Sequence, residues 1–242
     1  MISHFDDAKE LVNHAKGALP KLEQDYQSSL HDKTIKPAVL IDIKNLMENL
    51  RSALDFSAHG LFAKYGTSPK ANPKIYFPYA QLGQTQAAFL AANHIENFIP
   101  GIAARPDVVA RLNSYQHYSD PKNKRLPQFM DLNNENKHEK LTPQTRKEAR
   151  QLRIESRGTA IDLGPGASIS MGSGASIQFG DVVIPGGQDF SGERPAMVHG
   201  SGTQTVIVWV SFTFDANGET VLPFLKNAIS QVEWIVNELA GL

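Results

Sequence analysis

The sequence predicts an α+β protein, a mainly α-helical bundle with a Gly-rich antiparallel β insertion before its C-terminal helix. Apolar residues recur at helical spacing through most of the first 142 positions. Beyond Pro143 they alternate with polar residues, and glycines separate the pieces, as in short strands. The chain then closes on an amphipathic stretch. We therefore expect a helical bundle over 1–142, a β-rich insertion packed on the bundle over 143–220, and a helix over 221–242 that completes the bundle.

Five helices are expected before the insertion. The first covers about 8–26, and Pro20 should kink or split it because the ring removes a hydrogen-bond donor and clashes with the preceding turn. The clearest helix spans 36–65, and Gly66 is a natural stop. The other three are expected over 84–98, from Arg105 to near His117, and from Leu126 onward.

Within the insertion, Gly-Ala-Ser-Ile occurs at 166–169 and again at 174–177. This near-repeat predicts two consecutive strands joined by a tight Gly-Ser-Gly turn. The stretch 185–202 has no periodicity and is longer than a usual loop, so we interpret it as a mobile segment or a lid. Other strands are expected over 160–163, 182–184 and 205–214.

Composition excludes several classes of protein. With 24 basic and 25 acidic residues there is no global field to attract nucleic acid or membrane, so such binding needs a local patch. The absence of cysteine excludes disulfides, cysteine zinc sites and a thiol nucleophile. The N-terminus lacks the pattern of a signal peptide, and no apolar run is long enough to cross a membrane. We expect a cytoplasmic protein with no membrane partner.

Motifs for common cofactors are also missing. The chain has no phosphate-binding loop of nucleoside triphosphatases, no dinucleotide fingerprint and no nucleophile elbow of hydrolases. Its eight histidines are scattered, without the spacing of metal ligands. We therefore expect neither a cofactor nor a metal.

A polar stripe is expected on the second helix. Arg51, Asp55 and His59 are four residues apart and so share one helix face, and Glu48 adjoins Arg51. One interpretation is a network of ion pairs and hydrogen bonds between helices. The other is a polar cleft that binds a ligand.

Arg111 and His117 form a second constellation, near the end of the fourth helix. A neutral imidazole can take the 2′-hydroxyl proton of RNA while a guanidinium stabilises the charge that develops on phosphorus, with no metal required. In this hypothesis His117 is the general base and Arg111 stabilises the phosphorane. The alternative is that His117 interacts with the dipole at the helix C-terminus.

The fifth helix is unusually polar in its middle. Asn134 and His138 are one pair at helical spacing, and Asn133 and Lys137 are another. Such density indicates either a buried hydrogen-bond network or a site for an anion such as phosphate. The adjoining stretch 137–157 holds seven basic and three acidic residues, which fits a solvated face or an RNA-binding patch.

Three segments together resemble a widespread group of bacterial proteins with a HEPN-like helical fold. They are Asn-Leu-Arg-Ser-Ala-Leu-Asp at 49–55, Tyr-Phe-Pro at 76–78, and Leu-Pro-Gln-Phe-Met-Asp-Leu-Asn-Asn-Glu-Asn-Lys-His at 126–138. The resemblance covers roughly 36–141. It implies that these segments pack together as a bundle, and that a strand-rich stretch separates them from a final helix.

HEPN domains include metal-independent ribonucleases of toxin and defence systems, which act as dimers through an arginine and a histidine with four to six residues between them. Arg111 and His117 match that motif, although Leu112 stands where a polar residue often follows the arginine. The resemblance thus implies a protein that binds or cleaves RNA, with RNA and a second copy of the chain as partners. The alternative is a non-catalytic binding or assembly module with a buried polar network of Arg51, Asp55, Asn134, Lys137 and His138.

Overall fold

The computed structural model describes the chain in two compact units. One consists of Met1–Thr145 and Thr213–Leu242, here called the helical unit, and the other is Arg146–Phe212, here called the β unit. The mixed α+β class expected from the sequence is confirmed. The described residues are 3–31, 35–68, 70–138, 141 and 144–242, without the side chains of 30, 31, 136–138 and 209.

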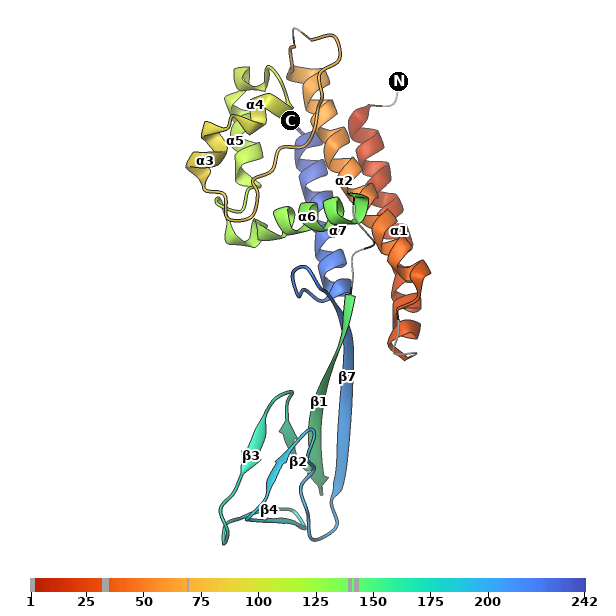
Figure 1. The fold of residues 1–242 in the computed structure, drawn as a ribbon, viewed down its shortest axis with the longest axis vertical. Helices are drawn as coiled ribbons and strands as arrows, with labels where there is room; N and C mark the ends of the chain where they lie inside the picture. Colours follow the sequence, from red (N-terminus) through yellow and green to blue (C-terminus); the bar gives the residue numbers. More distant parts are fainter. Residues whose placement is uncertain (1–2, 32–34, 69, 139–140, 142–143) are drawn as a thin grey trace. The chain divides into compact units, whose positions relative to one another are not determined.

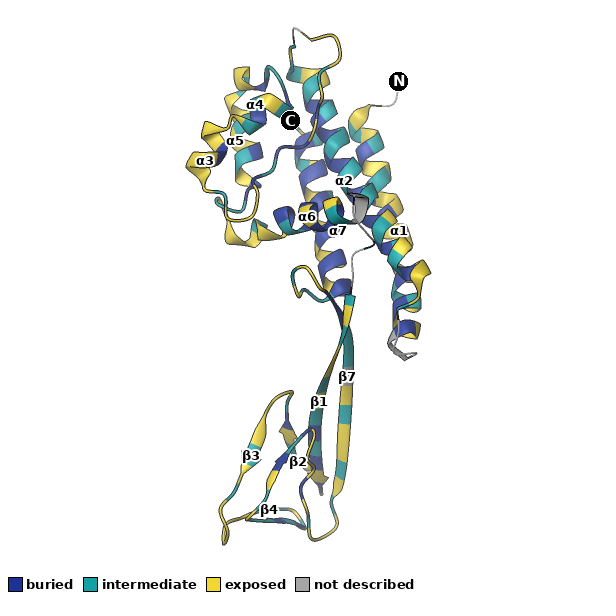
Figure 2. Ribbon diagram, viewed as in Figure 1, coloured by how far each residue is buried: buried dark blue, intermediate teal, exposed yellow. Residues whose placement is uncertain are grey.

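Three long helices form the main part of the helical unit: α1 (His4–His31), α2 (Pro37–Tyr65) and α7 (Val221–Ala240). They contact one another pairwise, and Figure 1 shows them side by side. Their facing stripes are buried in Figure 2, as the helical periodicity requires. This core includes Val12, Leu22, Met47, Leu50, Leu54, Leu225, Val232 and Val236.

The expected split of α1 at Pro20 is wrong, because the helix runs through the proline to His31. Pro20 lies on an exposed face, so the carbonyl that loses its donor can be hydrated. On the opposite side, buried residues of α1 pack against α2 and α7 on both sides of the proline, as Val12 and Leu22 do. Tertiary packing therefore outweighs the local penalty.

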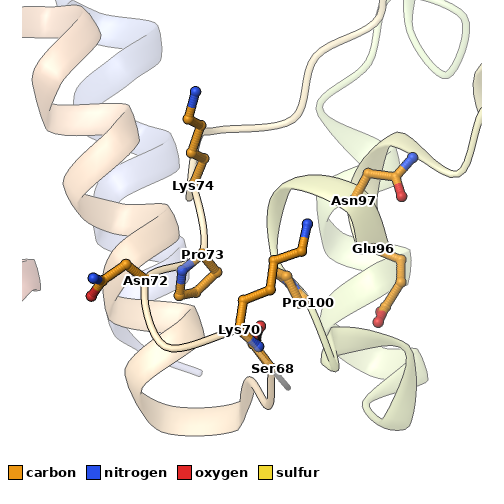
Figure 3. A pocket seen from close by; sticks show the side chains of 8 residues that line it. All are labelled: Ser68, Lys70, Asn72, Pro73, Lys74, Glu96, Asn97 and Pro100. Carbon is orange, nitrogen blue, oxygen red and sulfur yellow. Dashed lines mark hydrogen bonds between the residues drawn. The ribbon is translucent and has the colours of Figure 1, made fainter.

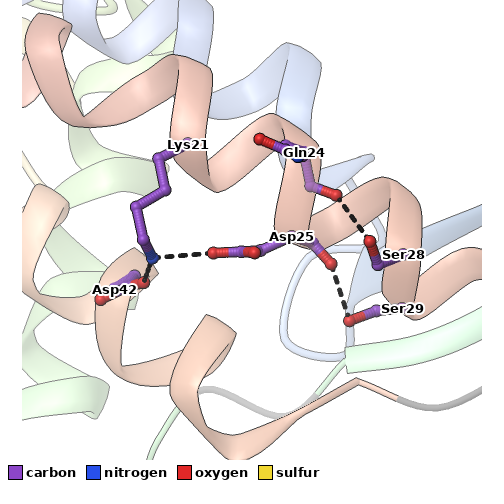
Figure 4. Close-up of polar contacts among 6 residues, drawn as sticks. All are labelled: Lys21, Gln24, Asp25, Ser28, Ser29 and Asp42. Carbon is purple, nitrogen blue, oxygen red and sulfur yellow. Dashed lines mark hydrogen bonds and ion pairs between the residues drawn. The ribbon is translucent and has the colours of Figure 1, made fainter.

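Polar contacts also join α1 to α2. The Lys21 ammonium donates to Asp25 at 2.8 Å within α1 and to Asp42 of α2 at 3.3 Å, and both bonds are drawn in Figure 4. Lys21 is largely exposed, so this bridge contributes little beside the apolar core. The neighbouring hydroxyls of Ser28 and Ser29 donate to carbonyls one turn back along α1.

Helix α2 ends at Tyr65, as expected, with Gly66 donating its N–H to the Phe62 carbonyl. The glycine is required by a close approach and not by a left-handed turn, because its φ is −78° and a Cβ there would overlap the Phe62 ring. The following segment is extended and leads to the remaining helices. They are α3 (Gln86–Ala91), α4 (His94–Phe98), α5 (Pro106–Ser114) and α6 (Arg125–His138), with 3-10 turns at Ile102–Ala104 and Pro121–Lys124.

Two of these boundaries differ from the expectation. The single helix over 84–98 is in fact the pair α3 and α4, because Asn93 between them is left-handed with a φ of 51°. The helix opened by Pro106 ends at Ser114, so that His117 lies in the turn beyond it.

The β unit contains three small antiparallel pairings. Strands β1 (Gln144–Ser156), β2 (Thr159–Leu163) and β7 (Thr203–Phe214) form a sheet in the order β2-β1-β7. The near-repeat strands β3 (Ser168–Ser170) and β4 (Ser176–Phe179) are not each other's partners. Instead β3 pairs with β6 (Asp189–Ser191), and β4 pairs with β5 (Val182–Pro185).

The stretch expected as a mobile segment or lid is tied to the rest of the β unit. It supplies β6, and Val183 exchanges two backbone hydrogen bonds of 2.9 Å with His199. Gln188 adds bonds to both backbone groups of Met197. A small core lies among these strands, formed by Leu152, Ile154, Leu163, Val182, Ile184, Phe190 and Ala196.

A polar cleft between α2, α6 and the 70–79 segment

Asp55 joins helix α2 to the extended segment that follows it. Its Oδ1 accepts the backbone N–H of Phe77 at 2.8 Å, and its Oδ2 accepts Arg51 Nε at 3.2 Å, one turn away on α2. Both side chains are largely buried, with exposures of 19% for Arg51 and 24% for Asp55. The carboxylate therefore satisfies a backbone donor that has no strand partner, while the arginine balances its charge.

The guanidinium of Arg51 is held on two further sides. It lies over the Tyr79 ring, 5.5 Å from the centroid, and its Nη1 donates to Met130 Sδ of α6. The Tyr79 hydroxyl in turn accepts Asn134 Nδ2 at 3.4 Å. The arginine thus connects α2, α6 and the extended segment, and its orientation is fixed.

These groups surround a cavity of about 290 Å³, which we call the amide cleft. Asn133 is 3% exposed, and its Oδ1 forms no hydrogen bond with any residue that the structure describes. A buried acceptor without a partner is costly unless a ligand or water supplies the donor. The lining of the amide cleft consists of Glu48, Arg51, Ser52, Asp55, Tyr76, Asn133 and Asn134.

His59 lines a neighbouring hollow of about 220 Å³ with His4 and Phe56, next to the amide cleft. The two cavities share Ser52 and Asp55. Burial lowers the pKa of His59, the nearby His4 lowers it further, and Asp55 acts in the opposite direction. The polar stripe of α2 therefore divides between two cavities, with Asp55 common to both.

The side chains of Lys137 and His138 lie outside the described residues, so their place relative to the cleft is not given. Of the expected polar residues, the structure brings Arg51, Asp55 and Asn134 together. Tyr76 is not among the site residues that the sequence predicts, because the aromatic residues of the Tyr-Phe-Pro segment are expected to be buried. Tyr76 is in fact 44% exposed.

The segment that carries Tyr76 has a regular alternation that could have revealed it. Ile75 and Phe77 are buried, whereas Lys74 and Tyr76 face outward. Alternate residues of an extended chain point to opposite sides, so Lys74 and Tyr76 share one side. Tyr76 lines the amide cleft, whereas Lys74 lines a separate hollow on the same segment.

A second, more open hollow of about 520 Å³ lies on the same segment. Figure 3 shows Lys70 and Lys74 on the segment along one side of it, and Glu96 and Asn97 of α4 on the other side. The Glu96 carboxylate is already engaged, because it accepts the backbone N–H groups of Gly101 and Ala103. Neither lysine forms an ion pair with a described residue. We call this feature the lysine hollow.

Arg111 and His117 are placed differently. Arg111 Nη1 forms an ion pair with Glu238 of α7 at 2.9 Å, and within the described part of the chain no hydrogen bond joins it to His117. His117 Nδ1 is buried in the turn beyond α5, without a described partner. Between them in sequence, the buried Tyr115 packs edge-on against Trp234 of α7. Burial raises the pKa of the Tyr115 hydroxyl.

The arginines of the basic stretch lie along β1 and the turn after it, and each has an acidic partner. Arg146 and Arg150 pair with Glu148, and Arg153 pairs with Glu155 and Asp162. Arg157 pairs with Asp181. This pattern favours the solvated face over the RNA-binding patch for the described part of that stretch.

In comparisons with family models, curated proteins and solved structures, nothing matched the chain. Among the described residues, no group of histidine, aspartate and glutamate side chains is arranged to hold a metal ion. None of the described helices has the length and apolar character needed to cross a membrane.

Proposed function

We propose that the helical unit is an RNA-binding module, which takes one unstacked base of a single strand into the amide cleft. One observation carries the proposal: Tyr76, whose ring is exposed, and Asn133, whose buried amide oxygen has no hydrogen-bond partner among the described residues, line the same cavity. Single-stranded RNA is recognised by stacking of bases on aromatic rings and by hydrogen bonds to base edges. The cleft offers both.

The chemistry of the cleft suits a base better than a phosphate. The lining holds two acids, Glu48 and Asp55, against one arginine, and Arg51 is already engaged by Asp55, so the cleft offers a phosphate no free cation. Glu48 pairs with Lys44 at 3.0 Å, and its carboxylate can accept a further hydrogen bond from the amino or imino group of a base. The volume of about 290 Å³ is at the lower limit of small-molecule pockets, as a single base requires. The lysine hollow supplies cations for the flanking phosphates, since Lys70 and Lys74 form no ion pair with an acidic residue that the structure describes.

The three segments that resemble HEPN-like proteins support the same site. They are far apart in the sequence, yet Arg51, Tyr76 and Asn133, one from each, line the amide cleft. A HEPN-like fold is therefore part of this proposal. Cleavage of RNA has less support, because Arg111 is engaged by Glu238 and has no described contact with His117. We propose binding without cleavage.

The test is fluorescence anisotropy with labelled single-stranded RNA homopolymers and an RNA duplex as comparison. Tyr76→Ala should weaken binding to the single strand by about 5- to 100-fold, the value of about 1–3 kcal/mol for one base stacked on an aromatic ring. Tyr76→Phe keeps the ring and should bind like the wild type. Absence of binding at low salt, or equal affinity of all three proteins, would contradict the proposal.

Asn133→Leu separates binding from folding. Leucine fills a similar volume and removes a buried acceptor without a partner, so the free energy of unfolding should not fall, while RNA affinity should. If instead the variant loses stability in urea titrations, Asn133 belongs to a structural network and the alternative of a closed polar core gains support.

The lysine hollow and cleavage are tested with the same RNA. RNA affinity should fall less steeply with salt in Lys74→Ala, because one phosphate contact is lost: the slope of log affinity against log salt should become smaller in magnitude by about 0.7. Lys122 is exposed and lies outside the hollow, so Lys122→Ala should leave the slope unchanged. RNA incubated with protein in chelator should remain intact on a denaturing gel. Cleavage that disappears in His117→Ala would restore the ribonuclease hypothesis in place of ours.

A further inference from the structure

Strand β7 has a composition that is unusual for the edge of a sheet. None of its residues, Thr203–Phe214, is charged, and none is histidine or proline. Natural edge strands are commonly protected by lysine, proline, a bulge or a covering element, because an open row of N–H and C=O groups invites another strand. Its neighbour β1, in contrast, carries Arg146, Lys147, Glu148, Arg150, Arg153 and Glu155.

The outer side of β7 is open along its middle. The strand is the last in the order β2-β1-β7, and within the described residues no further strand follows it. Near its ends, Gln204 bonds the Ala196 carbonyl and Phe214 pairs with Glu219. The stretch between these contacts, 205–211, is here called the β7 edge. It exposes Val206 by 39% and Val208 by 46%, and Figure 2 colours much of it as exposed.

Much of the sheet is also only two strands wide. Strand β2 pairs with β1 only over Leu152–Ser156, so among the described strands the earlier part of β1 has β7 as its only hydrogen-bonded partner. Figure 1 shows β2 at one end of the β1–β7 pair. Two-stranded ribbons are marginal in water, and a third strand with an apolar face stabilises them. A strand added at the β7 edge would supply it.

We propose that the β7 edge pairs antiparallel with the same edge of a second copy of the chain. A two-fold axis places β7 of one copy beside β7 of the other, so uncharged side chains lie next to uncharged side chains. The open backbone N–H and C=O groups of each copy can then bond those of the other. The arginines on the adjacent β1 are already paired with acids of their own chain, so the second copy brings no unpaired guanidinium beside Val206 and Val208. This pairing does not depend on RNA binding.

Sedimentation velocity over a range of concentrations tests the association. The wild type should approach twice the 26.6 kDa mass of the chain. Val208→Lys should shift the dissociation constant upward by at least tenfold, since each copy then buries a charge in the paired edge. Val208→Thr keeps a β-branched uncharged side chain and should dimerise. Ser168→Lys puts the same charge on exposed β3 and should also dimerise.

A wild type that stays monomeric at all concentrations would overturn the proposal, as would a dimer that is unaffected by Val208→Lys. Thermal melts of each variant show whether a loss of association reflects unfolding. Where Val208→Lys melts early, the next experiment gives an independent answer with small side chains.

A cysteine scan locates the interface, because the natural chain contains no cysteine. Single cysteines placed in turn at 205, 206, 207, 208, 210 and 211 are oxidised and analysed on non-reducing gels. In a two-fold antiparallel pair only residues at or beside the axis come close enough to form a disulfide. We expect one maximum within the β7 edge, with crosslinking that falls on both sides. Crosslinking no greater than at a control cysteine at Ser168 would show that the copies do not meet here.

Discussion

A buried glutamine of the helical unit and an exposed ion pair of the β unit use polar side chains in opposite ways. In the helical unit, Gln116 is 1% exposed, accepts the Ala80 N–H at 2.8 Å and donates to the Pro78 carbonyl at 3.2 Å. In the β unit, Arg153 and Asp162 are paired at 3.1 Å, but each is more than two-fifths exposed. Between the paired strands of the β unit, backbone groups bond one another, so charges such as these remain at the surface, while its loops also use side chains, as Gln188 does for Met197. The irregular segments of the helical unit depend on side chains for that purpose.

The largest effect that follows from this difference is expected at Gln116. In Gln116→Ala, the buried Ala80 N–H and Pro78 carbonyl lose their partner, at about 1–3 kcal/mol for each unsatisfied group. Urea titration should show a loss of at least about 2 kcal/mol in the free energy of unfolding.

A glutamine of the β unit is the matched control. Gln151 donates to Asp162 at the surface, and Gln151→Ala should change stability by less than about 0.5 kcal/mol. Equal losses in the two variants would remove the contrast between the units.

Asp55 gives a graded test of the same contrast. Asp55→Ala leaves the Phe77 N–H and the largely buried Arg51 without their acceptor, so a loss of about 1.5–3 kcal/mol is expected. Asp55→Asn keeps one oxygen for Phe77 and should lose less. Asp162→Ala breaks an exposed pair and should cost about 0–1 kcal/mol. Urea titrations should therefore rank the loss of stability as largest in Asp55→Ala. If Asp162→Ala showed the largest loss of the three, the contrast between the buried and the exposed carboxylate would be wrong.

The sequence predicted the long helices and the β insertion well, because both depend on the period of apolar residues. The stripe from Leu46 to Leu61 and the alternation around Leu152 each identify one element without knowledge of its neighbours. Which strands pair with each other could not be predicted in the same way. The similar strands β3 and β4 take β6 and β5 as partners, and nothing in Gly-Ala-Ser-Ile encodes that choice.

The candidate site was predictable only where its residues share one helix. Arg51 and Asp55 are neighbours on α2, so their spacing predicts the ion pair. Tyr76 and Asn133 join them through tertiary packing. The alternation of residues 74–77 can indicate that Tyr76 faces outward, but no local pattern places Tyr76 or Asn133 beside α2. The same applies to Arg111, whose partner Glu238 lies on the last helix, far from it in the sequence.

The smallest expected effect concerns the pH dependence of the helical unit. The pKa of His59 is lowered by burial and by His4, so the unfolded state takes up the proton at higher pH than the folded state. Stability should therefore be greatest above the ordinary histidine value of about 6.5, fall as the pH drops below it, and level off below the folded-state pKa.

His59→Gln removes this term, and its melting temperature should depend less on pH between neutral and mildly acidic buffer than that of the wild type. Asp55→Asn should lower the pKa of His59 further, because the carboxylate that favours the protonated ring is then absent. This change in the pKa can be followed by NMR. A His59 pKa at or above the ordinary value in the wild type would mean that the hollow beside the amide cleft is open to water, and that Asp55 does not couple the two cavities.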